Sequence, residues 1–158
     1  MEPTPFIGHV HLTVSDLDRA LAFYRDALGF EETARYGRDA VFLSFGGYHH
    51  HLGLNTWAGR GAPRAAPGTT GLYHFAILYP DRAALAAAVR RVVEAGIPLE
   101  GAADHGVSEA VYLRDPDGNG VELYRDRPRA EWPHSPDGGL AMVTRGLDLD
   151  GLLREGAG

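Results

Sequence analysis

Residues 9–30, HVHLTVSDLDRALAFYRDALGF, hold the pattern that decides the fold. Apolar and polar residues alternate through its first part, which is typical of a strand with one buried face. Ser15 or Asp16 can cap a helix whose apolar residues fall at helical spacing, and Gly29 suits the position just after its C-terminus. The stretch therefore predicts a strand over 7–14 that leads directly into a helix.

The same layout returns in HFAILYPDRAAL, residues 74–85. Both copies place a histidine seven residues before an aspartate, and a helical pattern that ends at a glycine follows. The second helix is predicted over 81–95, and a short helix near Leu147–Leu153. Later strands are predicted over 31–36, 40–45, 49–55, 98–102, 109–114 and 119–125. The chain therefore consists of two copies of a βαβββ unit.

Composition excludes several classes of function. The 158 residues include no cysteine, which rules out disulfides, thiolate zinc sites and iron–sulfur clusters. All 15 basic residues are arginine, so no lysine can form a Schiff base. A net charge of −6 argues against a nucleic-acid binder. No apolar run is long enough to span a membrane, and the first residues do not resemble a signal peptide, so we expect a cytoplasmic protein.

Strand alternation sends a small set of polar side chains to the faces opposite the helices. The set is His9, His11, His74, Tyr112, Arg114, Glu122 and Tyr124. His9 and His74 occupy the same offset in the two units. Two histidines and one carboxylate are the ligand set typical of non-haem iron, which leaves further coordination positions open. We expect these groups to converge if the two sheets curl around a shared space.

Three motifs resemble the vicinal oxygen chelate superfamily, which includes glyoxalase I, extradiol dioxygenases and bleomycin-binding proteins. They are the opening stretch, LYHFAILYPD (72–81) and YLRDPDGNGVELY (112–124). The resemblance implies an α+β fold in which two βαβββ modules form an open, cup-shaped mixed sheet around a metal. It implies His9, His74 and Glu122 as the metal ligands.

The resemblance also implies how the chain divides into domains. We expect a single domain over 6–127 and a C-terminal extension over 128–158. Within the domain, module one covers about 7–57, a linker 58–71 and module two about 72–127.

Two more segments resemble the extradiol, catechol 2,3-dioxygenase-type branch. GGYHHHLGLNTW (46–57) implies a catalytic histidine at His50, and DHGVSEAVYL (104–113) implies His105 and Tyr112. Candidate substrate contacts are His11, Tyr48, Trp57 and Tyr124. The implied reaction inserts O₂ into a catechol-type diol with Fe(II), or with Mn(II). Many such enzymes have four units rather than two, so we expect a homodimer.

Two assignments stay open at this stage. Plain alternation sends His49 and His51, rather than His50, toward the cup, unless a β-bulge near Gly46–Gly47 or at Gly53 changes the register. The position beside the His105 loop has two candidates, Tyr112 and Arg114.

Two rival functions would use the same scaffold. A glyoxalase-like isomerase, with Zn(II) or Ni(II), would use a fourth carboxylate from module one. Residues 40–80 contain no Asp or Glu, and the counterpart of Glu122 is expected within His49–His51, so only a histidine could substitute. A non-enzymatic drug-binding resistance protein is the other rival, although such binders often lack the metal ligands.

Overall fold

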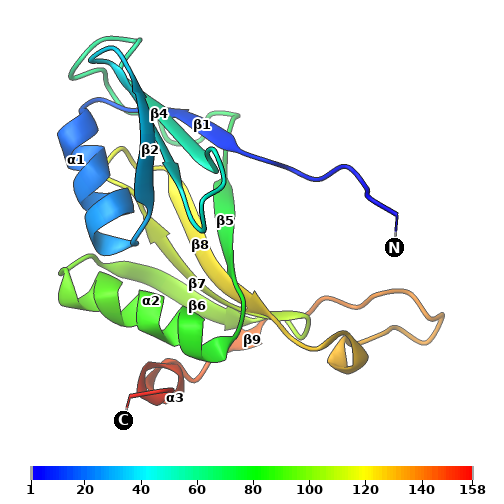
Figure 1. Ribbon diagram of the computed structural model, residues 1–158. Coiled ribbons are helices and arrows are strands. Elements are labelled where there is room, and N and C mark those ends of the chain that lie inside the picture. Colours follow the sequence, from blue (N-terminus) through cyan, green and yellow to red (C-terminus); the bar gives the residue numbers. More distant parts are fainter. Residues whose placement is uncertain (1, 158) are drawn as a thin grey trace. The chain divides into compact units, whose positions relative to one another are not determined.

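The computed structural model describes residues 2–157. The chain divides into two compact units, residues 1–69 (unit 1) and 70–158 (unit 2). Each unit has its own mixed sheet with a helix on one face (Figure 1). The α+β class and the βαβββ order of each unit are confirmed.

Unit 1 forms a four-stranded sheet in the order β1-β4-β3-β2. Its elements are β1 (Val10–Thr13), α1 (Leu17–Leu21), the π-helical turns η1 (Ala22–Ala27), β2 (Glu31–Tyr36), β3 (Ala40–Ser44) and β4 (Leu52–Asn55). β1 runs parallel to β4, whereas β3 is antiparallel to both β2 and β4. The predicted helix forms, but its second half widens into η1, which the apolar spacing did not indicate.

The repeated aspartate is the residue that starts each helix. The Asp16 side chain accepts a hydrogen bond from the Arg19 amide, and Asp81 accepts one from the Ala84 amide, each at 2.8 Å. These bonds satisfy backbone N–H groups that have no partner within the helix. The histidine-to-aspartate spacing is the same in both repeats because a strand and a turn of equal length precede each capped helix.

Unit 2 forms a five-stranded sheet in the order β5-β8-β7-β6-β9. Its elements are β5 (His74–Tyr79), α2 (Arg82–Glu94), β6 (Leu99–Asp104), β7 (Ser108–Arg114), β8 (Gly120–Asp126), the 3₁₀ turn η2 (Arg129–Glu131), β9 (Arg145–Gly146) and α3 (Leu149–Arg154). α2 packs on the sheet through fully buried residues that include Leu85 and Val89. None of the helices within residues 2–157 is both long and apolar enough to cross a bilayer.

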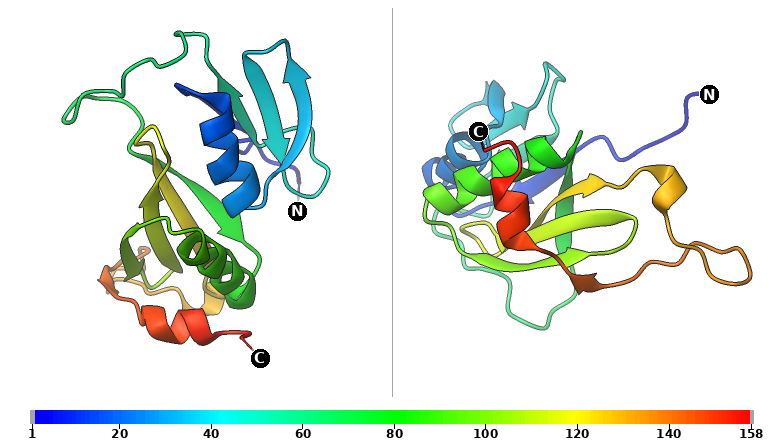
Figure 2. Two further views of the ribbon diagram at one scale, coloured as in Figure 1. Left: turned by 90° about the vertical axis from the view of Figure 1, so that its left-hand side faces the viewer. Right: turned by 90° about the horizontal axis from the view of Figure 1, so that it is seen from below.

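The C-terminal extension folds back onto unit 2. After β8 the chain runs out in a long loop and returns as β9 and α3 (Figure 2). β9 adds a fifth strand to the sheet by pairing with β6. Leu152 of α3 is fully buried, and α3 packs against α2. The predicted short helix therefore forms, whereas β9 was not predicted.

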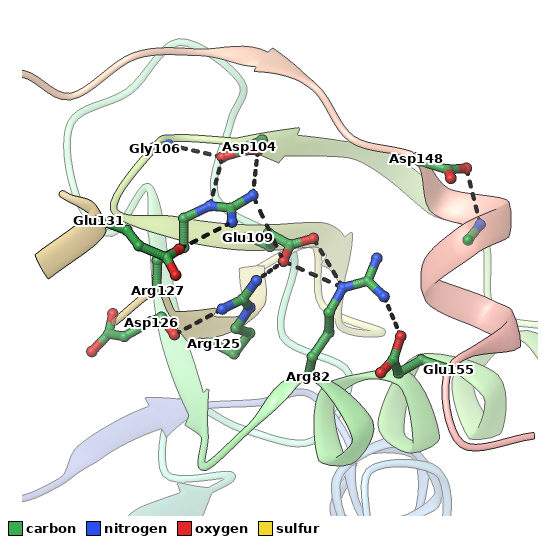
Figure 3. Close-up of polar contacts among 11 residues, drawn as sticks. Arg82, Asp104, Gly106, Glu109, Arg125, Asp126, Arg127, Glu131, Asp148 and Glu155 are labelled. Atoms are coloured by element: carbon green, nitrogen blue, oxygen red, sulfur yellow. Dashed lines mark hydrogen bonds and ion pairs between the residues drawn. The ribbon is translucent and has the colours of Figure 1, made fainter. Parts of the chain in front are cut away.

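A buried carboxylate on β7 takes part in an ion-pair network that connects β7, β8, α2 and the end of α3. Glu109 of β7 has 4% of its side chain exposed and pairs with Arg125 of β8. It also lies 3.3 Å from Arg82 of α2, whose guanidinium pairs in turn with Glu155 after α3 (Figure 3). A buried charge needs such partners, and losing one typically costs about 3–5 kcal/mol. This network joins the sheet, α2 and the C-terminal helix.

Candidate metal and catalytic site

His74 and Glu122 lie side by side on the sheet face of unit 2 that is opposite α2. β5 and β8 are parallel, with Ala76 opposite Glu122, so His74 and Glu122 share a face. His74 Nε2 lies 2.9 Å from Glu122 Oε2, and the two side chains are 32% and 12% exposed. The small Ala76 side chain leaves room for the imidazole beside the carboxylate. Two of the three predicted metal ligands are therefore together within one unit.

Gly120 is the residue that makes room for His74. It lies directly opposite His74 in the β5–β8 pair. A Cβ atom on Gly120 would lie 2.3 Å from the Tyr73 carbonyl oxygen and 2.8 Å from His74 Cβ. Both separations are far below van der Waals contact, so only glycine fits here. A cavity of about 320 Å³, lined in part by Tyr73, His74, Tyr112 and Arg114, opens beside it.

Tyr112 and His105 extend the row of polar groups from Glu122. Tyr112 lies opposite Glu122 in the β7–β8 pair. Its hydroxyl lies 2.6 Å from His105 Nε2. Burial, and then the neighbouring Glu122 carboxylate, raises the pKa of Tyr112 to about 12. Tyr112 therefore carries its proton at neutral pH and can donate one hydrogen bond.

Arg114 takes a different direction. Its guanidinium donates to Glu100 at 2.7 Å and to the Gly118 carbonyl at 2.9 Å. Of the two candidates for the position beside the His105 loop, Tyr112 is the one bonded to His105.

In unit 1, His50 reaches the predicted ligand His9. The centroids of the two rings are 4.5 Å apart, and His50 also contacts Phe42 edge-on at 5.0 Å. Burial, and then electrostatic repulsion between the His9 and His50 imidazoles, lowers the pKa of His50. His50 is therefore neutral at pH 7 and can accept a proton.

The turn before β4 explains how both His50 and His51 reach the outward face. His51 pairs with β3 through its backbone, and its Nδ1 lies 3.1 Å from the Ser44 hydroxyl. His50 precedes the paired residues, so strand alternation does not govern its direction. No shift interrupts the described β3–β4 register, so the proposed bulge is absent. Its place is taken by a turn at Gly46 and Gly47, both with positive φ.

The counterpart of Glu122 in unit 1 is Gly53, which corrects the expectation that it falls within His49–His51. His11 pairs with Gly53 in the parallel β1–β4 ladder, just as Ala76 pairs with Glu122 in unit 2. A Cβ on Gly53 would lie 2.8 Å from the His11 ring. The histidine run precedes this position, because the β1–β4 ladder pairs Val10 with Leu52 and His11 with Gly53. Module one therefore has neither a carboxylate nor a histidine at this position.

The predicted substrate contacts lie in both units. In unit 1, the His11 ring lies 5.5 Å from Trp57, whose side chain is 62% exposed, and Tyr48 stacks on His51 at 4.7 Å. In unit 2, Tyr124 follows Glu122 by two residues on β8, so the two share a face.

The predicted ligand set takes His9 from unit 1 and His74 with Glu122 from unit 2. Within residues 2–157 no three His, Asp or Glu side chains gather in a geometry that could hold a metal ion. Coordination of one ion by all three residues therefore stays a prediction.

Sequence reasoning missed two features of the site. The first is Gly120, which in sequence is only one of two glycines in the motif YLRDPDGNGVELY, with nothing to mark its contact with His74. The carbonyl of Val143 lies 2.9 Å from His105 Nδ1. A backbone carbonyl leaves no trace in residue type, so no sequence signal could have found it.

Residues 6–123 match the Glyoxalase/Bleomycin resistance protein/Dioxygenase superfamily. The chain belongs to this superfamily. The match covers module one and module two as far as Leu123 in β8, and it confirms the family that the three sequence motifs indicated.

Two relatives within the superfamily are dioxygenases by name. The chain is 42% identical to a catechol-2,3-dioxygenase of Bacillus subtilis over 149 residues, which are 94% of this chain and 51% of the relative. It is 35% identical to biphenyl-2,3-diol 1,2-dioxygenase 3 of Rhodococcus globerulus, over 80% of this chain and 66% of that protein. The chain thus spans about half the length of the first relative and just under two thirds of the second.

Solved structures of the superfamily share the fold. A lactoylglutathione lyase from Agrobacterium tumefaciens matches with a TM-score of 0.59 and 31% identity, over 78% of this chain and 96% of that one. A glyoxalase/dioxygenase from Nostoc punctiforme matches with a TM-score of 0.63 and 21% identity, over 78% and 92% of the two chains. Dioxygenases and a lyase thus share this scaffold, and only the site residues can separate the two chemistries.

We expect Gly120→Ala to lower the free energy of unfolding by about 1–3 kcal/mol, because the added methyl must displace backbone or His74. Gly101→Ala on β6 is the matched control, since its Cβ would meet nothing within 4 Å. That variant should stay within about 0.5 kcal/mol of the parent. Urea denaturation followed by tryptophan fluorescence measures both, and equal stabilities would contradict the role assigned to Gly120.

Proposed function

We propose that the protein is a metal-dependent extradiol dioxygenase that cleaves the ring of a catechol-type substrate with O₂. The observation that carries the proposal is the row His74–Glu122–Tyr112–His105, in which an imidazole–carboxylate pair adjoins a hydrogen-bonded tyrosine and histidine. The likeness to two ring-cleaving dioxygenases supports it.

His9, His74 and Glu122 are the proposed ligands of one divalent ion. The donor set fits Fe(II), and Mn(II) accepts the same ligands, because imidazole nitrogen and carboxylate oxygen both suit these ions. Glu122 is a nearly buried carboxylate, and such a group favours a cationic partner. When bound, the ion would supply a chelation point for both diol oxygens and bring O₂ to the same centre.

His50 is the proposed proton acceptor in this reaction. It is neutral at pH 7 because burial, and then repulsion from the His9 imidazole, lowers its pKa. Its ring lies against His9, so it is beside the proposed metal centre. It would accept a proton from a substrate hydroxyl and return it as the ring opens. Both atoms of O₂ enter the product, so the reaction needs no further oxidant or reductant.

Tyr112 and His105 are the proposed partners of the substrate oxygens. When the Tyr112 proton points to His105 Nε2, 2.6 Å away, the Tyr112 oxygen would accept a hydrogen bond from a diol hydroxyl. His11, Tyr48, Trp57 and Tyr124 would contact the aromatic ring, as such side chains favour flat apolar ligands. A homodimer is proposed from the resemblance alone.

Gly53 distinguishes this proposal from a glyoxalase-like isomerase. That branch uses a fourth carboxylate in module one, and the position equivalent to Glu122 is a glycine covered by His11. No side chain from Gly53 can coordinate a metal. A purely drug-binding role is disfavoured for a different reason, since it does not require His74 and Glu122 to be adjacent.

We predict that protein loaded anaerobically with Fe(II) turns catechol or 4-methylcatechol yellow on exposure to air and consumes oxygen. Absorbance and an oxygen electrode follow the two events, with iron-free protein as the control. The hemithioacetal of methylglyoxal and glutathione, tested in parallel, should not be isomerised. Neither colour nor oxygen uptake across a panel of catechols would overturn the proposed function.

We predict that His50→Gln lowers kcat by about 10²–10⁴-fold, the usual contribution of a positioned acid–base group, while the bound iron is retained. His51→Gln is the matched control in the same histidine run, because its ring bonds to Ser44 and not to His9. It should keep most of the activity. Stopped-flow kinetics together with iron analysis measures both variants, and a larger loss in the His51 variant would contradict the assignment.

A further inference from the structure

The C-terminal extension contacts His105 through the main chain of Val143 and the side chain of Thr144. His105 sits in the turn between β6 and β7, and its Nδ1 lies 2.9 Å from the Val143 carbonyl oxygen. The Val143 amide donates to the His105 carbonyl at 3.1 Å. The Thr144 hydroxyl lies 3.3 Å from the same Nδ1. Two contacts to Nδ1 and one to the backbone thus fix the position of His105 and of its ring.

Both partners of this contact are held firmly in unit 2. On one side of Val143, Pro133 packs over Gly106, where an added Cβ would lie 2.7 Å from the proline ring. On the other side, Arg145 of β9 pairs with Asp104 of β6. Beyond β9, α3 is anchored by Leu152 and by the Arg82–Glu155 ion pair (Figure 3).

Hydrogen bonds within unit 2 also hold the turn that carries His105. Asp104 accepts a hydrogen bond from Arg127 at 2.7 Å and one from the Gly106 amide at 2.8 Å (Figure 3). The bond from Arg127 lowers the pKa of Asp104, so this carboxylate stays ionised at neutral pH. The His105 amide donates to the Ser108 carbonyl at 2.8 Å. The histidine therefore has little freedom to turn away from Val143.

The chemistry of the two partners decides which ring nitrogen carries the proton. A carbonyl oxygen can only accept, so the 2.9 Å contact requires a proton on Nδ1. In a neutral imidazole Nε2 then has a lone pair, which faces the Tyr112 hydroxyl at 2.6 Å. A hydroxyl has a single proton, and Tyr112 has two acceptors in reach, His105 Nε2 and the Glu122 carboxylate.

We infer that the Val143 carbonyl fixes neutral His105 as the Nδ1–H tautomer, so that Tyr112 donates its proton to His105 rather than to Glu122. The C-terminal extension is thereby a positioning element for the site, and Val143 acts through His105. The Glu122 oxygens keep their lone pairs for His74 and a cation. This catalytic consequence rests on the proposed function, whereas the tautomer itself does not.

The alternative state has the opposite bond directions. A histidine free in water prefers the Nε2–H tautomer. In that form Nε2 would donate to the Tyr112 oxygen, and the tyrosine proton would go to Glu122. A carboxylate that accepts this bond has one lone pair fewer for a metal. The two states therefore differ at a nitrogen that can be observed directly.

The test is a long-range ¹⁵N–¹H NMR spectrum of the full chain, labelled at histidine and free of metal, at a pH where imidazole is neutral. The His105 signals are those lost in His105→Gln. We expect the Nδ1 shift of a protonated nitrogen and the Nε2 shift of an unprotonated one. A protonated Nε2, or shifts averaged as in free histidine, would overturn the inference.

A backbone substitution tests the cause. Replacing Thr144 with its α-hydroxy analogue converts the Val143 carbonyl from an amide to an ester, which is a weaker acceptor. The His105 spectrum should then shift toward the Nε2–H form. The same replacement at the exposed Met142, which alters the Ala141 carbonyl, is the control and should leave the spectrum unchanged. Equal spectra for the two esters would overturn the role of Val143.

Turnover separates this inference from the proposed function. If the protein cleaves catechols, the Thr144 ester should lower kcat by about threefold to tenfold with little change in KM, in line with the loss of one hydrogen bond. If it cleaves none, the proposed function fails, but an Nδ1–H tautomer that depends on the Val143 carbonyl still supports the positioning role.

Discussion

Glu122 is a carboxylate whose side chain is only 12% exposed, and the site is organised around its need for partners. An ionised group removed from water must be compensated by hydrogen bonds or by opposite charge. His74 lies against it from β5, and Tyr112 lies opposite it on β7. The strand register dictates these neighbours, because β5, β8 and β7 bring alternate residues to one face. A shift of one residue would turn the whole set into the core.

The two modules share a layout but differ at the equivalent position. In unit 2 the position holds Glu122, whereas in unit 1 it holds Gly53 with His11 packed against it. Unit 2 therefore has a carboxylate at this position, whereas in unit 1 the His11 ring lies there beside Phe42 and Trp57. Because Gly53 has no side chain, unit 1 offers no carboxylate ligand at the position where unit 2 has Glu122.

Sequence patterns predicted most of the fold because periodicity and caps are local. The strands of both units, the capping aspartates Asp16 and Asp81, and the glycines that end the helices were readable from residue type and spacing. The pair His74–Glu122 also followed, since strand alternation fixes which side chains share a face. The family match over 6–123 agrees with this interpretation.

The features that sequence missed depend on turns and on the backbone. The direction of His50 is set by a glycine turn outside the ladder. The β1–β4 register places the counterpart of Glu122 at Gly53, two residues beyond the end of the His49–His51 run. β9 has only two residues, too few to show alternation. The contact of the Val143 carbonyl with His105 depends on the path of a long loop. None of these is encoded in the periodicity of side chains.

Metal binding by single-residue variants tests the central claim most directly. Anaerobic titration with Fe(II) should show one tightly bound ion per chain in the parent and in His134→Ala, a control in the exposed C-terminal loop. His9→Ala, His74→Ala and Glu122→Ala should each lose tight binding, because an ion held by three protein ligands does not survive the loss of one. Stoichiometric, undiminished binding in any of these three variants would contradict the account.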